Sequence, residues 1–495
     1  MLILQISFCS ITVPERISIN NDNNRGPDLA QYSNKWYIFL VVAVGVFMST
    51  LDSSMVNIAL PSIMDEFDSQ LNKTEWVVLI YLLTITATLL FWGHLSDRLG
   101  RRRIYGSGML LFAAASLACA YSQTLSQLIV FRLLQALGAA MMMSTGPAII
   151  KETFPAEQLG RGLGMIGVAV SLGLMTGPSI GGLLIEYYSW RAIFFLTVPI
   201  GLLFTFFAAK TLPTTVNGIQ FTRIDWLGGL AWAVLLTALS LAITHLSSAS
   251  WSKSYIIYSS IIALAALLLF IYQELVTLYP ILPLQLFKKR YFSIAAVCAV
   301  LSFMVLFTAI MLTPFYLARI RQLQPFHIGL IMMAIPLSVL IIGPFAGWIS
   351  DHIGRKIPAT LGLVTTSAGT FFMSQIDAAT PLWQIALFLG VLGCGQAMFL
   401  SPNSASVLSH AHSDHNGISA AMLATARNLG MLLGIAQASL VFSLSFSRAT
   451  GGFDMKDFSP ALTAPFITAF SAAFSVALVA GILGAVLSWL RGPDK

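Results

Sequence analysis

Charged residues are scarce in this chain. Of its 495 residues, 9% are charged and 57% are apolar, whereas a soluble domain usually carries about 25% charged residues. A water-soluble fold of this length could not hide so much apolar surface, because much of any folded surface faces solvent. The composition therefore excludes a soluble globular protein and predicts a protein embedded in lipid.

Signatures of metal centres, disulfide frameworks and ATP hydrolysis are missing as well. The four cysteines (Cys9, Cys119, Cys298 and Cys394) are scattered and form no CxxC or Cys/His spacing, which argues against a bound metal or a disulfide framework. No stretch matches the phosphate-binding pattern G-x-x-x-x-G-K-[ST], and no polar segment is long enough for an ATPase domain. We therefore expect neither an enzyme nor a pump that hydrolyses ATP itself.

Positive charge is in excess, with a net charge of +7. The basic residues gather in short loops between long apolar runs, which is the distribution that orients membrane proteins. We therefore expect no nucleic-acid partner, and the partner that the composition does predict is the lipid bilayer.

The sequence contains fourteen apolar runs, and a bilayer core requires about 20 such residues per helix. They cover residues 36–61, 75–95, 104–122, 126–150, 160–185, 191–211, 226–246, 254–274, 292–317, 327–349, 357–376, 382–405, 416–444 and 466–489. With a cytoplasmic N-terminus, 18 of the 27 lysines and arginines fall in inner segments and seven in outer ones, as the positive-inside rule requires. The predicted fold class is an all-α polytopic membrane protein with both termini in the cytoplasm.

An internal repeat accounts for the number fourteen. The pattern G-x-x-S-D-x-x-G-R-[RK] begins at Gly93, after the second run, and again at Gly347, after the tenth. Two six-helix halves would place the copies six runs apart, so the spacing of eight predicts two inserted helices. The expected units are a cytoplasmic tail (1–35), an N-terminal half (36–211), the inserted pair with its linkers (212–291), a C-terminal half (292–489) and a short tail (490–495).

The first 33 residues lack the basic start and the cleavage site of a signal peptide. They are interpreted either as a native tail or as the product of an early start codon.

The repeat loops and several other stretches resemble the major facilitator superfamily, and within it the fourteen-helix drug:proton antiporters of the multidrug efflux type. The further stretches are Leu51-Asp52, Asn57 to Pro61, Arg132 to Gly138, Gly173 to Gly182 and Arg427 to Gly430. The second repeat loop departs from the family pattern, because His352 stands where an arginine is usual. The resemblance implies a major facilitator fold, alternating access in the plasma (inner) membrane, and function as a monomer.

Asp52 is the only carboxylate that we place deep in a run, about 16 residues or ~24 Å into its helix. A carboxylate there is unfavourable unless it is paired, hydrated or protonated, so it is interpreted either as a proton-coupling group or as half of a structural ion pair. Arg132 stays charged and cannot carry the proton itself. The resemblance implies that Arg132 changes partners as a carboxylate titrates, and a structural tie between helices is the alternative.

Four further polar residues within the runs are predicted to line the substrate cavity. They are Asn57, Gln135, Arg427 and Asn428. For Arg427 and Asn428 a structural role is an equal alternative, because no deep acidic partner is visible in the second half of the chain.

The repeat loops are predicted to form a cytoplasmic gate that holds the two halves together through carboxylates, basic residues and helix dipoles. Its residues are Gly93, Asp97, Arg98, Gly100, Arg101, Arg102, Gly347, Asp351, Gly354 and Arg355. Charge that only sets topology would need the basic residues but not the glycines and aspartates at these spacings.

Gly173, Gly177 and Gly181 are four residues apart and share one helix face, which allows another helix to approach closely. Pro178 permits a bend. With Gly182, these residues match the antiporter motif of the resembled family, which favours export.

The sequence thus predicts secondary active export of small amphiphilic, drug-like molecules in exchange for protons, with no cofactor besides the coupling proton. Proton-coupled import or uniport of a small metabolite is the alternative. A membrane-embedded enzyme or sensor is disfavoured by the gate loops and the Gly/Pro run. The substrate's identity and charge stay open, as does the participation of a periplasmic adaptor and an outer-membrane channel.

Overall fold

The computed structural model describes residues 35–155, 158–212, 225–246, 253–277, 290–409 and 416–491. The predicted tails and most of the linkers lie outside these ranges, and the described part is helical without any β-strand. The helices are α2 (Lys35–Glu66), α3 (Leu71–Thr74), α4 (Trp76–Leu99), α5 (Arg101–Ala120), α6 (Leu125–Thr153), α7 (Leu159–Tyr187), α8 (Arg191–Thr211), α9 (Trp226–Leu246), α10 (Lys253–Val276), α11 (Arg290–Arg319), α12 (Pro325–Met332), α13 (Ala334–Ile353), α14 (Lys356–Ser374), α15 (Leu382–Ser409), α16 (Asn416–Thr450) and α17 (Thr463–Trp489), with two short 3₁₀ turns at Met455–Asp457 and Pro460–Leu462.

Every one of the fourteen apolar runs coincides with a helix or a helix pair, which confirms the all-α polytopic class. Twelve helical spans are long and apolar enough to cross a membrane, and the bent pair Leu71–Leu89 with Phe91–Leu99 makes a thirteenth. The remaining run is α14, whose 19 residues include five serines and threonines before its last residue. This helix packs against both α15 and α17, so a large part of its surface faces protein instead of lipid.

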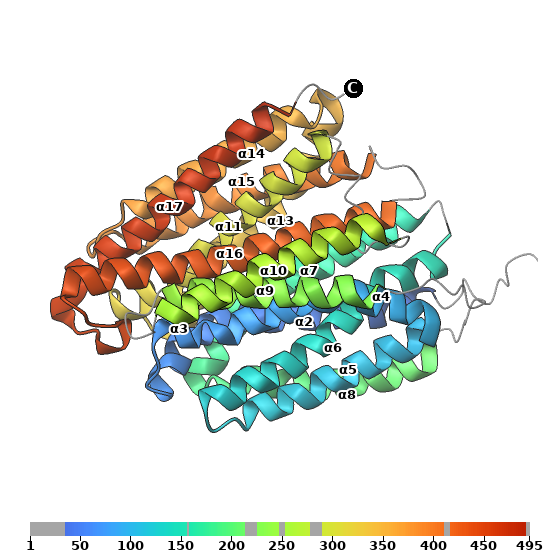
Figure 1. The fold of residues 1–495 in the computed structure, drawn as a ribbon, viewed down its shortest axis with the longest axis horizontal. Helices are drawn as coiled ribbons and strands as arrows, with labels where there is room; N and C mark the ends of the chain where they lie inside the picture. Colours follow the sequence, from blue (N-terminus) through green and yellow to red (C-terminus); the bar gives the residue numbers. More distant parts are fainter. Residues whose placement is uncertain are drawn as a thin grey trace, which may run out of the picture.

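The two halves repeat the same helix pairings (Figure 1). In the N-terminal half α2 packs against α7 and α5 against α6, and in the C-terminal half α11 packs against α16 and α14 against α15. In both repeat loops the second glycine ends one helix with a left-handed backbone, at φ 92° for Gly100 and 86° for Gly354, a conformation that glycine adopts without strain. Eight residues after each of them, Gly108 and Gly362 lie against the next helix.

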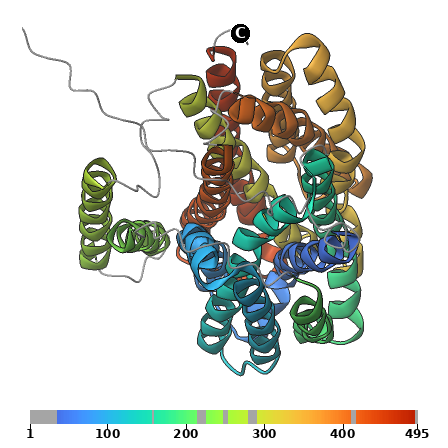
Figure 2. The ribbon, with the colours of Figure 1, turned by 90° about the vertical axis from the view of Figure 1, so that its right-hand side faces the viewer.

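The inserted helices α9 and α10 form a hairpin beside the bundle (Figures 1 and 2). Helix α9 packs against α10, and also against α4 of the first half and α16 of the second. The rings of Trp226 in α9 and Phe91 in α4 lie 4.7 Å apart. The Asp225 carboxylate accepts hydrogen bonds from the Gly228 backbone N–H at 2.8 Å and from the Gln273 side chain of α10 at 3.1 Å. The hairpin is thus capped at its start and attached to both halves through one helix.

The two halves are joined at their outer ends by polar contacts. Arg319 at the end of α11 pairs with Asp65 at the end of α2. Lys456 lies 4.0 Å from Asp68, and Glu186 in α7 accepts a hydrogen bond of 3.1 Å from the first turn of α12. These contacts connect the end of the N-terminal half that faces away from the cytoplasm to the same end of the C-terminal half.

Candidate functional site: a buried polar network in the first half

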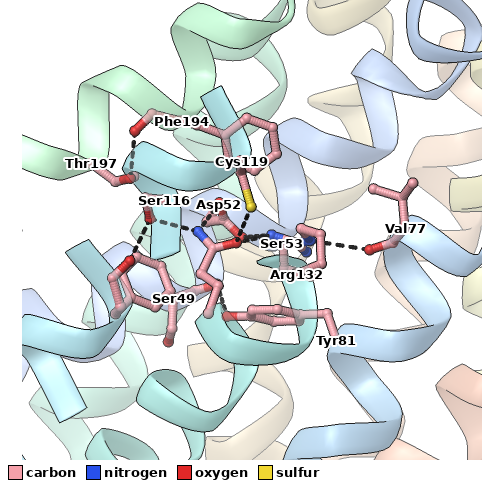
Figure 3. Close-up of polar contacts among 12 residues, drawn as sticks. Ser49, Asp52, Ser53, Val77, Tyr81, Ser116, Cys119, Arg132, Phe194 and Thr197 are labelled. Carbon is pink, nitrogen blue, oxygen red and sulfur yellow. Dashed lines mark hydrogen bonds and ion pairs between the residues drawn. The ribbon is translucent and has the colours of Figure 1, made fainter. Parts of the chain in front are cut away.

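Asp52 of α2 and Arg132 of α6 form an ion pair inside the first half (Figure 3). Arg132 Nη1 lies 2.5 Å from Asp52 Oδ2, and both side chains are 0% exposed. Because an uncompensated charge is costly in the membrane interior, each group is held in place by the other. The two residues that sequence patterns singled out are therefore in direct contact.

Gln135 extends the ion pair into a network of three helices. Its side-chain amide donates to Asp52 Oδ1 at 2.9 Å and to Ser116 Oγ in α5 at 2.7 Å, while its oxygen accepts from Arg132 Nη1 at 2.6 Å. The Cys119 thiol lies 3.9 Å from the same oxygen. A carboxylate that accepts from both a guanidinium and an amide has the bonding of an ionised group. Both carboxylate oxygens of Asp52 thus have a hydrogen-bond donor in the network.

Arg132 is fixed by more than its acidic partner. Its Nε donates to the Val77 carbonyl of α4 at 3.1 Å, and its guanidinium carbon lies 4.2 Å from the centre of the Tyr81 ring. Its Nη2 has no hydrogen-bond partner within the described ranges. The arginine therefore has an unbonded nitrogen, Nη2, with which to bind an acceptor if Asp52 is neutralised.

The second half has no copy of this network. Gly138 of α6 contacts α5, and Gly395 of α15 contacts α14 in the same way. Arg132 and Gln135 lie six and three residues before Gly138. The residues six and three before Gly395 are Leu389 and Leu392. Gly173 packs against Thr50 of α2, and Gly430 packs against Phe303 of α11. Asp52 lies two residues after Thr50, so its counterpart is Val305, two residues after Phe303. All three counterparts are apolar and fully buried. The Asp52–Arg132–Gln135 network therefore has no counterpart at these positions of the second half.

Three predicted cavity residues lie apart from this network, and their role stays a prediction. The Asn57 amide donates to the Ser53 carbonyl of its own helix at 2.9 Å. Arg427 in α16 donates through Nη2 to Ser404 Oγ of α15 at 2.6 Å. Asn428, its neighbour, is half-buried. Of the four predicted cavity residues, only Gln135 contacts Asp52.

At the inner end, the described contacts of the first repeat loop stay within the N-terminal half. Arg101 pairs with Asp97 at 3.0 Å and with Glu152 of α6 at 2.8 Å, while Arg102 bonds the Ala209 carbonyl of α8. Arg98 lies in the last turn of α4. The predicted gate between the halves stays a prediction.

In the second repeat loop, a Cβ added to Gly347 would lie 3.4 Å from Ser401 Oγ. Gly354 and Arg355 connect α13 to α14. The side chain of Asp351 lies outside what the structure describes.

The glycines of α7 form two close interfaces. Gly173, Gly177 and Gly181 face α2, where a Cβ added to Gly177 would lie 2.5 Å from Ser54 Cβ. On the other side of the helix, Gly182 meets Pro325 of α12, and the Pro178 carbonyl meets Gly329 of α12. The motif therefore packs α7 against its own half and against the opposite half together.

A profile described as Major Facilitator Superfamily matches residues 42–435 and 295–495 of this chain. The chain belongs to the major facilitator superfamily. It is therefore a multi-pass transporter of the plasma membrane and not an enzyme.

Among its relatives, the riboflavin transporter RibZ of Clostridioides difficile (strain 630) is 34% identical over 463 residues, which cover 93% of this chain and 99% of RibZ. The methylenomycin A resistance protein of Streptomyces coelicolor is 29% identical, over 81% of this chain and 84% of that protein. The crystal structure of a bacterial homologue of the human lysosomal transporter Spinster is similar in fold, with a TM-score of 0.64 and 15% identity over 92% of this chain and 97% of that one.

Several residues of the network escaped prediction from the sequence. Ser116 and Cys119 are ordinary small residues in an apolar run, and nothing in their spacing marks them. Glu152 had a usable signal, because it is an acidic residue at the inner end of α6 facing a basic loop. The sequence signal for the ion pair between Asp65 and Arg319 was weaker, since each residue lies only at a helix end predicted to face outward.

Proposed function

We propose that this protein is a secondary active transporter that exports small amphiphilic molecules in exchange for protons by alternating access. The observation that carries this proposal is the fully buried network of Asp52, Arg132 and Gln135. Asp52 is a carboxylate in the middle of a membrane helix with an exchangeable partner, so it is able to take up and release a proton.

Protonation would change the bonding of the network in a defined way. A neutral carboxyl attracts the guanidinium much more weakly than a carboxylate does, and Arg132 has in Gln135 a neutral acceptor at 2.6 Å. Arg132 can therefore turn from Asp52 towards Gln135 without leaving its charge unbonded. Because these residues connect α2, α5 and α6, a change in their bonding changes how the helices of the first half pack.

Polar contacts between the two halves support alternating access. In this state they join the halves at their outer ends. The step that follows substrate binding would exchange these contacts, opening the outer end and bringing the repeat loops together.

Export is supported by the methylenomycin A resistance relative and by the glycine run of α7. The riboflavin transporter relative favours a second candidate, which is proton-coupled import or uniport of a small metabolite. The two candidates differ in the direction in which a proton gradient drives the substrate.

The test uses the purified chain in liposomes and a panel of anionic, neutral and cationic amphiphiles that includes riboflavin. An antiporter accumulates substrate in vesicles with an acidic interior and releases protons as it does so, whereas a symporter needs an acidic exterior. We expect antiport, abolished in Asp52→Asn. Flux without proton movement, or proton-coupled flux that is unchanged in Asp52→Asn, would contradict the assignment.

A further inference from the structure

Arg427 is a half-buried cation without an acidic partner in the described part of the chain. Its Nη2 donates to Ser404 Oγ at 2.6 Å, and its guanidinium carbon lies 5.9 Å from the centre of the Phe303 ring. The adjacent Nε is enclosed by protein but has no hydrogen-bond partner there. In contrast with Arg132, its charge is therefore not neutralised by a carboxylate.

The surroundings of Arg427 belong to three helices of the second half. Arg427 is on α16, Ser404 on α15 and Phe303 on α11. One turn further along α16, Gly430 lies against the α11 backbone. This contact fixes the position of Arg427 along the helix axis relative to α11. Helix α16 also packs against α4 of the first half, so Arg427 is on a helix that borders the interface between the halves. The side chains of Arg427 and Ser404 are half-buried.

An anionic partner for this arginine would be energetically favourable, and the described part of the chain provides none. A guanidinium keeps its proton under any physiological condition, and an unpaired charge inside a membrane protein is unfavourable. The deep carboxylate of the described spans, Asp52, is already bonded to Arg132 and Gln135. Arg427 is thus a cation without an acidic partner in the described interior, and such a cation attracts anions and repels cations.

We propose that Arg427, Ser404 and Phe303 form a subsite for the anionic end of an aromatic substrate, an inference that rests on the proposed transport function. The Nε–Nη2 edge of a guanidinium binds a carboxylate through two parallel hydrogen bonds. The Ser404 hydroxyl donates to the Leu400 carbonyl of its own helix at 2.6 Å and accepts from Nη2, so it orients the guanidinium, while the Phe303 ring provides an apolar contact for the body of the ligand. A substrate with a fixed positive charge is disfavoured at this place.

The first half has no equivalent subsite. Arg427 lies three residues before Gly430, and the matching residue before Gly173 is Val170. Proton exchange at Asp52 and charge selection at Arg427 are therefore assigned to different halves, so substitutions in each half can separate them.

The test measures equilibrium binding to the full chain in lipid nanodiscs at pH 7, with empty nanodiscs as the blank. The fluorescent probes share one ring system and differ in charge: 9-anthracenecarboxylate, 9-anthracenemethanol and 9-(aminomethyl)anthracene. We expect the carboxylate to bind most tightly. Arg427→Leu should weaken its binding by about tenfold or more, since a hydrogen bond to a charged group is lost, while the neutral and cationic probes change little.

The matched control is Arg448→Leu, which removes the same charge from an exposed position near the other end of α16 and should leave all three affinities unchanged. Arg427→Lys should give an intermediate loss, because lysine keeps the charge but lacks the planar fork. If Arg427→Leu does not fold, as judged by thermal unfolding, Arg427→Gln replaces it. The proposal is overturned by tighter binding of the cationic probe, by no measurable binding of the carboxylate, or by a preference that survives these substitutions.

Binding at equilibrium needs no proton gradient, so this outcome is independent of the coupling test. Asp52→Asn should lose proton-coupled transport but keep the order of probe affinities. Proton-coupled export without a preference for the anionic probe would remove the subsite and leave the proposed function intact.

Discussion

Asp65 and Glu66 are consecutive carboxylates at the end of α2 that pair in opposite directions. Asp65 pairs with Arg319 of the second half, whereas Glu66 pairs with Arg191 of its own half and accepts from Trp190 Nε1 at 2.5 Å. One residue therefore connects the two halves, and its neighbour holds the outer end of the first half together.

Asp65→Asn is expected to shift the protein towards its outward-facing conformation. An exposed ion pair contributes up to about 1 kcal/mol, so the population ratio should change by up to about fivefold. The distance between spin labels at the exposed positions Lys73 and Ala449 reports the change. Glu66→Gln is the matched control, because it removes the same charge without removing a contact between halves; an equal shift in both variants would show that charge alone is responsible.

Arg132→Leu is expected to destabilise the protein strongly, because it leaves Asp52 charged and unpaired in the interior. Breaking a buried ion pair in this way typically costs about 3–5 kcal/mol. The double variant Asp52→Asn with Arg132→Leu removes both charges, so it should recover much of the thermal stability of the purified protein while proton-coupled transport stays absent. Equal instability of the single and double variants would mean that the loss comes from packing and not from charge.

Gly177→Val is expected to disrupt the contact of α7 with α2. An added Cβ would lie 2.5 Å from Ser54 Cβ and 3.2 Å from the Leu51 carbonyl, and overpacking of this kind costs about 1–3 kcal/mol. Gly167→Val in the same helix is the control, since a Cβ there has nothing within 4 Å. A lower unfolding temperature and lost transport in the first variant alone would verify the interface; similar losses in both would point to helix propensity instead.

Asp225→Ala is expected to loosen the start of the inserted hairpin. The substitution removes the acceptor of the Gly228 N–H, and loss of such a cap costs about 0.5–2 kcal/mol. Amide hydrogen exchange in the first turn of α9 should therefore accelerate by roughly two- to thirtyfold. Gln273→Ala, which removes only the bond to α10, should leave that turn protected; if it does not, the connection between the helices matters more than the cap.

The helices could be predicted from the sequence because bilayer thickness fixes the length of an apolar run. The glycine face of α7 could be predicted for a related reason, since the helical period alone puts Gly173, Gly177 and Gly181 on one side. The importance of Asp52 and Arg132 followed from the rarity of charge in apolar runs. In each case a local pattern was sufficient.

Contacts between distant segments could not be predicted in the same way. Asp52 and Arg132 are 80 residues apart and Arg319 and Asp65 are 254 apart, so their meeting depends on helix tilt and register, which no local pattern encodes. Ser116 shows the limit clearly, because its hydroxyl matters only once Gln135 is known to point at it. The expected contact of the inner loops across the halves depends on conformation as well as on sequence.

The assignment of proton uptake to the single carboxylate of Asp52 has an electrical consequence. One carboxylate takes up at most one proton in a cycle. If the exported molecule is a monovalent anion, a proton entering and an anion leaving together move two positive charges inward, which makes transport electrogenic and adds about 4.6 kcal/mol of driving force per 100 mV of membrane potential. A monovalent cation exchanged for the same proton would move no net charge, so clamping the voltage across the vesicle membrane reads out the charge of the substrate before its chemical identity is known.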